Sequence, residues 1–206
     1  MTRPEYALLA ELRPAPPAPV ETKIPLIDEA EATGETAAAY QYFRDQTGRQ
    51  DVPGILKCFG TNPLFVRQMV DLSSTLLFAE GYLTRRQKEM IATYVSKLNE
   101  CPYCLDSHGF FLLVHGAPDE VASKIIAGEI EEAAISDAER HLLLYVGKVN
   151  GESFKTTKED VQQLRDFGWQ DEQIAEAVHV GTMMGLCNRV ANAFGLPAQG
   201  FLELKR

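Results

Sequence analysis

The chain has 206 residues, and its 45% hydrophobic content is enough to build the core of one large domain or two small ones. With 29 acidic and 20 basic residues its formal net charge is −9, which argues against nucleic acid or an anionic membrane as the main partner. The sequence lacks a run of about 18 apolar residues and an amino-terminal basic region followed by an apolar one. We therefore expect no membrane insertion or export, and a cytoplasmic location.

Residues 1–34 are expected to be peripheral. The stretch 13–19 reads Arg-Pro-Ala-Pro-Pro-Ala-Pro, which cannot form the interior of a helix and favours an extended polyproline conformation. We interpret it as a proline-rich arm that lies over the surface or wraps a neighbouring subunit. Residues 35–206 are then assigned to a single domain.

Helix start and stop signals recur through the rest of the chain, while alternation with a period of two is rare. Asparagine, serine or threonine N-caps, prolines at first positions and terminal glycines delimit most of the helices. The predicted helices cover residues 35–46, a short segment ending near 59, and residues 63–80, 85–98, 102–115, 118–128, 137–150, 157–168 and 171–194. The pattern predicts an all-α protein with roughly eight to ten helices packed together.

A short internal similarity suggests two related helical halves. Residues 94–99 read Tyr-Val-Ser-Lys-Leu-Asn, and residues 145–150, at an offset of 51, read Tyr-Val-Gly-Lys-Val-Asn. A Cys-x-x-Cys sequence follows the first copy, whereas the second copy is followed by Gly-Glu-Ser. Any chemistry that depends on the cysteines therefore belongs to the first half.

The segment 99–108, Asn-Glu-Cys-Pro-Tyr-Cys-Leu-Asp-Ser-His, carries the clearest chemical signal. If Pro102 is the first helical residue, Cys101 lies near the N-cap and Cys104 lies in the first turn. Free backbone N–H groups and the helix dipole favour a thiolate there. His108 lies one turn on, on the same face as Cys104, and could exchange a proton with it. We interpret the segment as a dithiol redox site.

A metal site is the less favoured interpretation. Tetrahedral zinc needs four converging ligands, but the next candidate after His108 is His115, roughly 16 Å along the helix from Cys104. The remaining cysteines, Cys58 and Cys187, lie among apolar residues and are expected to be buried core thiols.

The dithiol also needs an acid–base partner that orients the histidine, and Glu89 is the best candidate. Glu89 lies off the main apolar stripe of its helix, beside small residues that would let another helix approach. The alternative is a surface glutamate paired with Arg85 or Arg86 one turn earlier. The residues alone leave both interpretations open.

The spacing of Glu89, Cys101, Cys104 and His108 resembles the E-x11-C-x2-C-x3-H signature of the alkylhydroperoxidase AhpD-like group in the carboxymuconolactone decarboxylase superfamily. Residues 83–91 resemble the family's lead-in helix, and residues 178–194 resemble the last helix of its longer "peroxidase-related" members. The resemblance covers roughly residues 50–197.

The resemblance implies an AhpD-like helical bundle that forms a homo-oligomer (dimer, trimer or hexamer) and reduces hydroperoxides without haem or flavin. It further implies a dithiol reductant, either a lipoylated or a thioredoxin-like protein. By position, Cys104 would attack the peroxide, Cys101 would resolve the intermediate, and Glu89 with His108 would form the proton relay.

One departure from the family concerns Tyr103, which stands where the best-known peroxidase members have a second histidine. A phenol cannot serve as a base near neutral pH, so the relay would be shorter here. Two alternatives remain at this point. One is a non-enzymatic dithiol redox sensor or binding module. The other is a decarboxylase-type lyase on the same fold, which the cysteine pair argues against.

Overall fold

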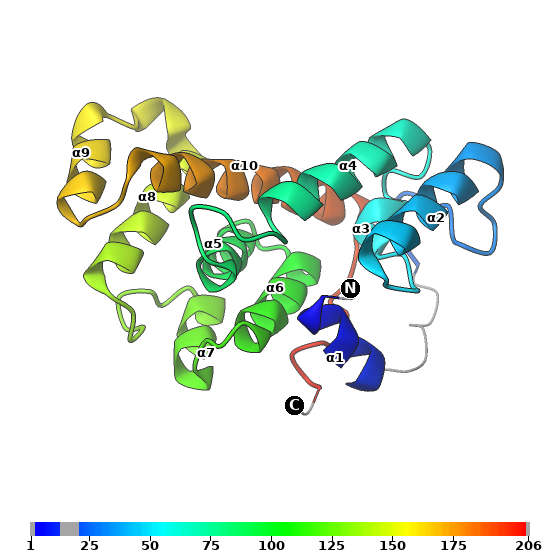
Figure 1. The fold of residues 1–206 in the computed structure, drawn as a ribbon, viewed down its shortest axis with the longest axis horizontal. Helices are drawn as coiled ribbons and strands as arrows, with labels where there is room; N and C mark the ends of the chain where they lie inside the picture. Colours follow the sequence, from blue (N-terminus) through cyan, green and yellow to red (C-terminus); the bar gives the residue numbers. More distant parts are fainter. Residues whose placement is uncertain (1–2, 13–20, 205–206) are drawn as a thin grey trace.

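The computed structural model describes residues 3–12 and 21–204 (Figure 1). Their secondary structure comprises ten α-helices and one short 3₁₀ helix, without any β-strand among these residues. The all-α prediction is therefore confirmed, while the proline-rich stretch 13–19 lies outside the described residues. The helices are α1 (Pro4–Leu12), α2 (Gly34–Thr47), α3 (Gly54–Lys57), α4 (Pro63–Leu76), α5 (Arg85–Leu98), α6 (Pro102–Val114), α7 (Asp119–Ala127), α8 (Asp137–Glu152), η1 (Ser153–Lys155), α9 (Lys158–Asp166) and α10 (Asp171–Phe194).

Side-chain caps set the start of several helices where the sequence predicts them. Thr84 and Ser136 each accept a backbone hydrogen bond in a capping box at the start of α5 and α8, and Asn62 accepts from Phe65 at the start of α4. The predicted extension of α4 to residue 80 is wrong, because the helix ends at Leu76. The backbone carbonyls of Leu76 and Ala79 instead accept hydrogen bonds from the buried Lys88 ammonium, each at 2.8 Å.

The longest helix, α10, crosses much of the molecule above α5 and α6 in the view of Figure 1, and it contacts α5, α6 and α8. α5 and α6 form a closely packed pair below it, and α2 and α4 pack together at one end of the molecule. Within residues 3–12 and 21–204, no helix is both long and apolar enough to cross a membrane.

The two similar segments of the sequence meet directly. Asn99 follows α5 and Asn150 lies on α8, and each donates an amide hydrogen bond to the other's side-chain oxygen at 3.0 Å. These asparagines are equivalent positions at the offset of 51 residues. The reciprocal pair supports the interpretation of two related helical halves.

The amino-terminal residues contain a helix that the sequence analysis did not predict. Tyr6 and Leu9 of α1 are buried in a small apolar cluster with Phe110 and Phe111 of α6 and with Phe201. α1 spans only nine residues, too short for its periodicity to stand out in the sequence. This part of the expected peripheral segment is therefore packed onto the helix that carries the dithiol.

Candidate active site

The dithiol follows a tight turn between α5 and α6. Glu100 has a left-handed backbone (φ 49°), and its N–H donates to the Lys97 carbonyl while the Cys101 N–H donates to the Ser96 carbonyl, each at 3.0 Å. This pair of hydrogen bonds is a Schellman motif that ends α5. Pro102 then opens α6 with Cys101 as its N-cap, as the sequence predicts.

The two thiols differ in what surrounds them. Cys101 is completely buried, whereas Cys104 is buried but lines a cavity. The pKa of Cys101 is lowered to about 7, chiefly by a hydrogen bond from the Cys104 thiol, with smaller contributions from the Cys104 backbone N–H, the Asn188 side chain and His108; burial opposes the change. The Cys104 pKa is raised by the same hydrogen bond and by burial. The dithiol therefore loses its first proton readily and its second with difficulty, and the first thiolate is centred on Cys101.

Asn188 of α10 is a site residue that the sequence analysis did not single out for a role. It is fully buried, and its amide donates to the Ser96 hydroxyl at 3.0 Å and accepts from Asn99 at 2.9 Å. Its side chain also lowers the pKa of both Cys101 and Cys104 through hydrogen bonding. α10 thus supplies a polar group to the dithiol at the start of α6.

Glu89 contacts both partners that the sequence left as alternatives, His108 and Arg85. Its Oε2 lies 2.7 Å from Nδ1 of His108, and its Oε1 accepts from Nη2 of Arg85 at 2.6 Å. It is not a surface residue, because its side chain is 0% exposed. An ionised carboxylate only accepts hydrogen bonds, so His108 carries its proton on Nδ1 and keeps Nε2 as a free acceptor.

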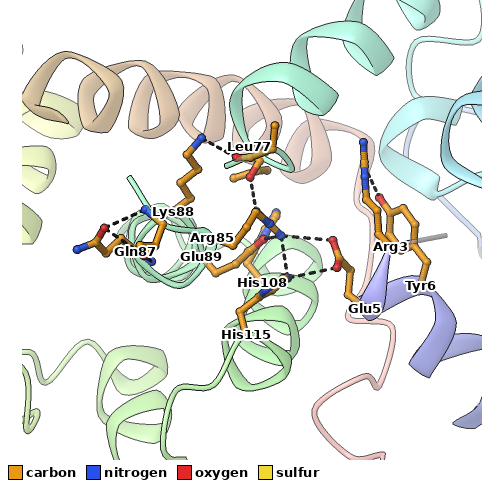
Figure 2. Close-up of polar contacts among 12 residues, drawn as sticks. Arg3, Glu5, Tyr6, Leu77, Arg85, Gln87, Lys88, Glu89, His108 and His115 are labelled. Carbon is orange, nitrogen blue, oxygen red and sulfur yellow. Dashed lines mark hydrogen bonds and ion pairs between the residues drawn. The ribbon is translucent and has the colours of Figure 1, made fainter. Parts of the chain in front are cut away.

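The ion pair continues beyond Glu89 into a buried network (Figure 2). Arg85 also contacts Glu5 of α1 and His115 at the end of α6, and Glu5 and His115 contact each other. His115 caps the carboxyl end of α6, but its ring is engaged in this network. Glu5 was missed by the sequence analysis because no local pattern links residue 5 to residue 85.

A cavity of about 90 Å³ lies beside the dithiol. Cys104 and His108 face it together, and most of the remaining lining is aromatic or aliphatic, including Phe43, Phe59, Met69, Phe78, Phe111 and Met184. Among the described residues that line it, the charged side chains are Arg3 and Arg49, with no carboxylate. The arrangement presents a thiol and an imidazole to a small apolar ligand.

Tyr103 also lines the cavity and does not replace the family's second histidine. Its hydroxyl accepts a hydrogen bond from the Ile55 N–H at 3.3 Å, and burial raises its pKa above the usual range for tyrosine. The phenol therefore stays protonated near neutral pH. Its ring forms part of the cavity wall.

The remaining cysteines are buried, as predicted. Burial raises the pKa of Cys58 and of Cys187 to about 12, so both stay protonated at neutral pH. Cys187 nevertheless lines the same cavity as Cys104. Within the part of the chain that the structure describes, no three His, Cys, Asp or Glu side chains are arranged to hold a metal ion.

The carboxyl-terminal segment closes one side of the cavity. The Asp106 carboxylate on α6 accepts backbone N–H bonds from Gln199 (2.9 Å), Phe201 (3.0 Å) and Leu202 (3.1 Å). Gln199 and Phe201 line the cavity. α6 therefore carries both the reactive groups and the anchor for the segment that encloses them.

Comparisons with known proteins find a matching family model and similar solved structures. Residues 63–148, which include Glu89, Cys101, Cys104 and His108, match the model of the carboxymuconolactone decarboxylase family. The chain is similar to a solved peroxidase-related protein with an alkylhydroperoxidase AhpD core from Ralstonia eutropha JMP134, with a TM-score of 0.78 and 26% identity, covering 91% of this chain and 97% of that one.

Two further solved structures share the fold. A peroxidase-related protein from Silicibacter sp. TM1040 matches with a TM-score of 0.76 and 24% identity, covering 93% of this chain and 98% of that one. The debrominase Bmp8 matches with a TM-score of 0.70 and 17% identity, covering 89% and 95%. The resemblance expected from the sequence is confirmed: residues 63–148 match the carboxymuconolactone decarboxylase family model, and the chain has the AhpD-like helical fold.

Proposed function

We propose that this protein reduces organic hydroperoxides with its Cys101–Cys104 dithiol, assisted by the Glu89–His108 pair. The observation that carries the proposal is that Cys104 and His108 line one cavity, while the Glu89 carboxylate is hydrogen-bonded to the far side of the imidazole. A thiol, a base and a group that orients the base are the parts that nucleophilic thiol chemistry needs.

The reaction begins with a proton shift within the dithiol. The Cys104 thiol donates its hydrogen bond to Cys101, so transfer of that proton leaves the thiolate on Cys104, which faces the cavity. The Cys104 sulfur attacks the terminal oxygen of the hydroperoxide, and the O–O bond breaks. The Nε2 atom of His108 takes up the proton that the dithiol loses when it ionises. Cys104 becomes a sulfenic acid, and the alkoxide takes this proton from His108 and leaves as an alcohol.

The second step closes the disulfide. His108, now neutral, accepts the proton of the Cys101 thiol, and the Cys101 sulfur attacks the sulfenic sulfur of Cys104. The hydroxide that leaves takes the proton from His108 and becomes water. Overall, two thiols and one hydroperoxide give one disulfide, one alcohol and one water.

The cavity supports a small alkyl hydroperoxide as substrate. Its lining is mainly aromatic and aliphatic, which favours an apolar group over hydrogen peroxide. Its volume of about 90 Å³ favours a compact alkyl group over a long chain. A compact substrate such as tert-butyl hydroperoxide is therefore the appropriate probe.

Turnover requires a partner that restores the dithiol. We propose a dithiol carrier protein, lipoylated or thioredoxin-like, because a disulfide is reduced by exchange with another thiol pair. We also propose that the protein works as a homo-oligomer, as its resemblance to the family implies. Light scattering measures the mass in solution, and a mass of one chain would overturn this part.

Steady-state kinetics with cysteine variants test the proposal. Peroxide consumption driven by excess dithiol reductant should fall to background in Cys104→Ser and in Cys101→Ser. Cys58→Ser is the matched control, because Cys58 is equally buried but is not among the residues that line the cavity, and it should keep its turnover. Wild-type turnover in either variant of the pair contradicts the mechanism.

Reductive debromination is a second candidate function. The similarity to the debrominase supports it through the shared fold only, because the sequence identity is 17%. A dithiol beside an apolar cavity could also remove bromide from a small halogenated ring. Incubating the reduced protein with a brominated pyrrole and measuring released bromide separates the two candidates. We expect hydroperoxide to be consumed much faster.

A further inference from the structure

Glu5 brings a buried carboxylate from the amino-terminal helix to the proposed relay. Its side chain is only 1% exposed, and it lies outside residues 63–148, the family's matched region. Its Oε1 lies 3.3 Å from Nη2 of Arg85, and its Oε2 lies 3.2 Å from Nε2 of His115. Figure 2 shows Glu5 pointing from α1 toward Arg85, on the side away from Glu89.

Arg85 is shared between Glu5 and Glu89. The same Nη2 atom that faces Glu5 donates to Oε1 of Glu89, while Nη1 donates to the Leu77 carbonyl. The guanidinium also stacks on the Phe78 ring, with a distance of 5.2 Å to the ring centre. The position of Arg85 therefore fixes one oxygen of Glu89, and the other oxygen holds His108.

Anchoring α1 does not by itself require Glu5. Tyr6 and Leu9 already bury apolar surface against Phe110, Phe111 and Phe201. Burying a carboxylate costs free energy, and an apolar side chain could hold a helix equally well. Burial acts to raise the pKa of Glu5, but the hydrogen bond from His115 and the charge of Arg85 outweigh it, so the net pKa is lowered. The negative charge of Glu5 is thus kept near the Glu89–His108 pair.

We propose that Glu5 is a positioning residue for the Glu89–His108 pair: it holds Arg85 in place and adds negative charge behind the imidazole. The amino-terminal helix is then a working part of the active site. This inference rests on the proposed function of that pair.

Other charged or titratable groups surround the pair as well. They are Arg85 on α5, Glu5 and Tyr6 on α1, Cys101 at the start of α6, Tyr103, Cys104 and His115 on α6, Cys187 on α10, and Arg3 and Arg49 at the cavity. Of these, Glu5 is the carboxylate, and it opposes the positive charge of Arg85. Removing either member of this ion pair should therefore act on His108 in opposite directions.

The direction in which each variant moves the pH profile follows from the role of His108 as a base. Removing the Glu5 charge disfavours the protonated imidazole, so the base stays neutral to lower pH. Glu5→Gln should move the acid limb of kcat/KM to lower pH by about half a unit to one unit, and lower kcat/KM at neutral pH about three- to tenfold, because the base is weaker and less firmly held. Arg85→Gln removes a positive charge and should move the acid limb to higher pH.

The experiment compares these variants of the full chain with two controls on the same helix. Glu11→Gln removes an exposed carboxylate of α1, and Leu9→Ala loosens the packing of α1 while leaving Glu5 unchanged. The pH profile of tert-butyl hydroperoxide reduction is measured for each. In parallel, the titration of the His108 ring is followed by NMR, with its signal identified from a His108→Asn variant.

Opposite displacements for Glu5→Gln and Arg85→Gln, without displacement in Glu11→Gln, support the proposal. It is overturned if Glu5→Gln keeps the wild-type profile, or if Leu9→Ala displaces the profile equally, since helix packing would then be the cause. The NMR titration needs no turnover. If the wild type consumes no hydroperoxide, the proposed function fails while the role of Glu5 is still decided.

Discussion

Each oxygen of Glu89 has one defined partner, Arg85 on one side and His108 on the other. An amide at this position could not keep both. With its oxygen toward Arg85, Glu89→Gln would place an NH₂ group against the Nδ1–H of His108, and the imidazole would turn or change tautomer. We expect kcat/KM at neutral pH to fall about 10²-fold.

Glu139→Gln is the matched control for Glu89→Gln. Glu139 pairs with Arg86, the neighbour of Arg85, and forms the capping box of α8 away from the cavity. The Glu139→Gln variant should keep kcat/KM within about twofold of the wild type, because Glu139 does not contact the relay. Equal kcat/KM in the two variants would show that Glu89 forms a structural ion pair only.

The two thiols should titrate as a coupled pair. Because the pKa of Cys101 is lowered to about 7, the first thiolate should be present above about pH 7 and lost below it. Cys104→Ala removes the thiol that donates to Cys101, so the Cys101 midpoint should rise by about one unit or more. Ultraviolet thiolate absorbance against pH measures both. An unchanged midpoint in Cys104→Ala would show that this hydrogen bond does not tune Cys101.

At the scale of helices, the close approach of α8 and α10 depends on Gly181. A Cβ atom there would lie 2.6 Å from Cγ1 of Val146, which is itself completely buried. Gly181→Ala should lower the free energy of unfolding by about 1–3 kcal/mol through overpacking. Denaturant unfolding measures the change.

Gly151 provides the matched control on α8. A Cβ atom at this helical glycine would meet no atom within 4 Å. Gly151→Ala should therefore leave the stability unchanged or raise it by up to about 1 kcal/mol, since alanine favours a helix. If Gly181→Ala were as stable as Gly151→Ala, the packing of the two helices would be looser than described.

Helices and their starts were largely predictable, because caps and apolar periodicity are local. Thr84, Pro102 and Ser136 each begin a helix where the sequence indicates. The contact between Glu89 and His108 was reached through a resemblance, since their pairing depends on how α5 packs against α6. Glu5 could not be predicted, because its partner lies 80 residues away and α1 is short.

At the scale of the whole molecule, the cavity is assembled from distant parts of the chain. Four residues from distant segments line it together with Cys104: Arg3, which precedes α1, Tyr6 from α1, Met184 from α10 and Phe201 from the carboxyl-terminal segment. Figure 1 shows α1 and that segment side by side near α6. The residues that match the family model therefore include the proposed reactive groups, and flanking segments supply much of the cavity wall.

The central claim is that the dithiol itself reduces a hydroperoxide. The most direct measurement mixes the reduced protein with tert-butyl hydroperoxide without any reductant and analyses the products of a single turnover. We predict that each chain consumes one equivalent, yields one equivalent of tert-butanol and forms a disulfide between Cys101 and Cys104, identified by peptide mass. Peroxide loss without that disulfide, or no loss at all, would contradict the account.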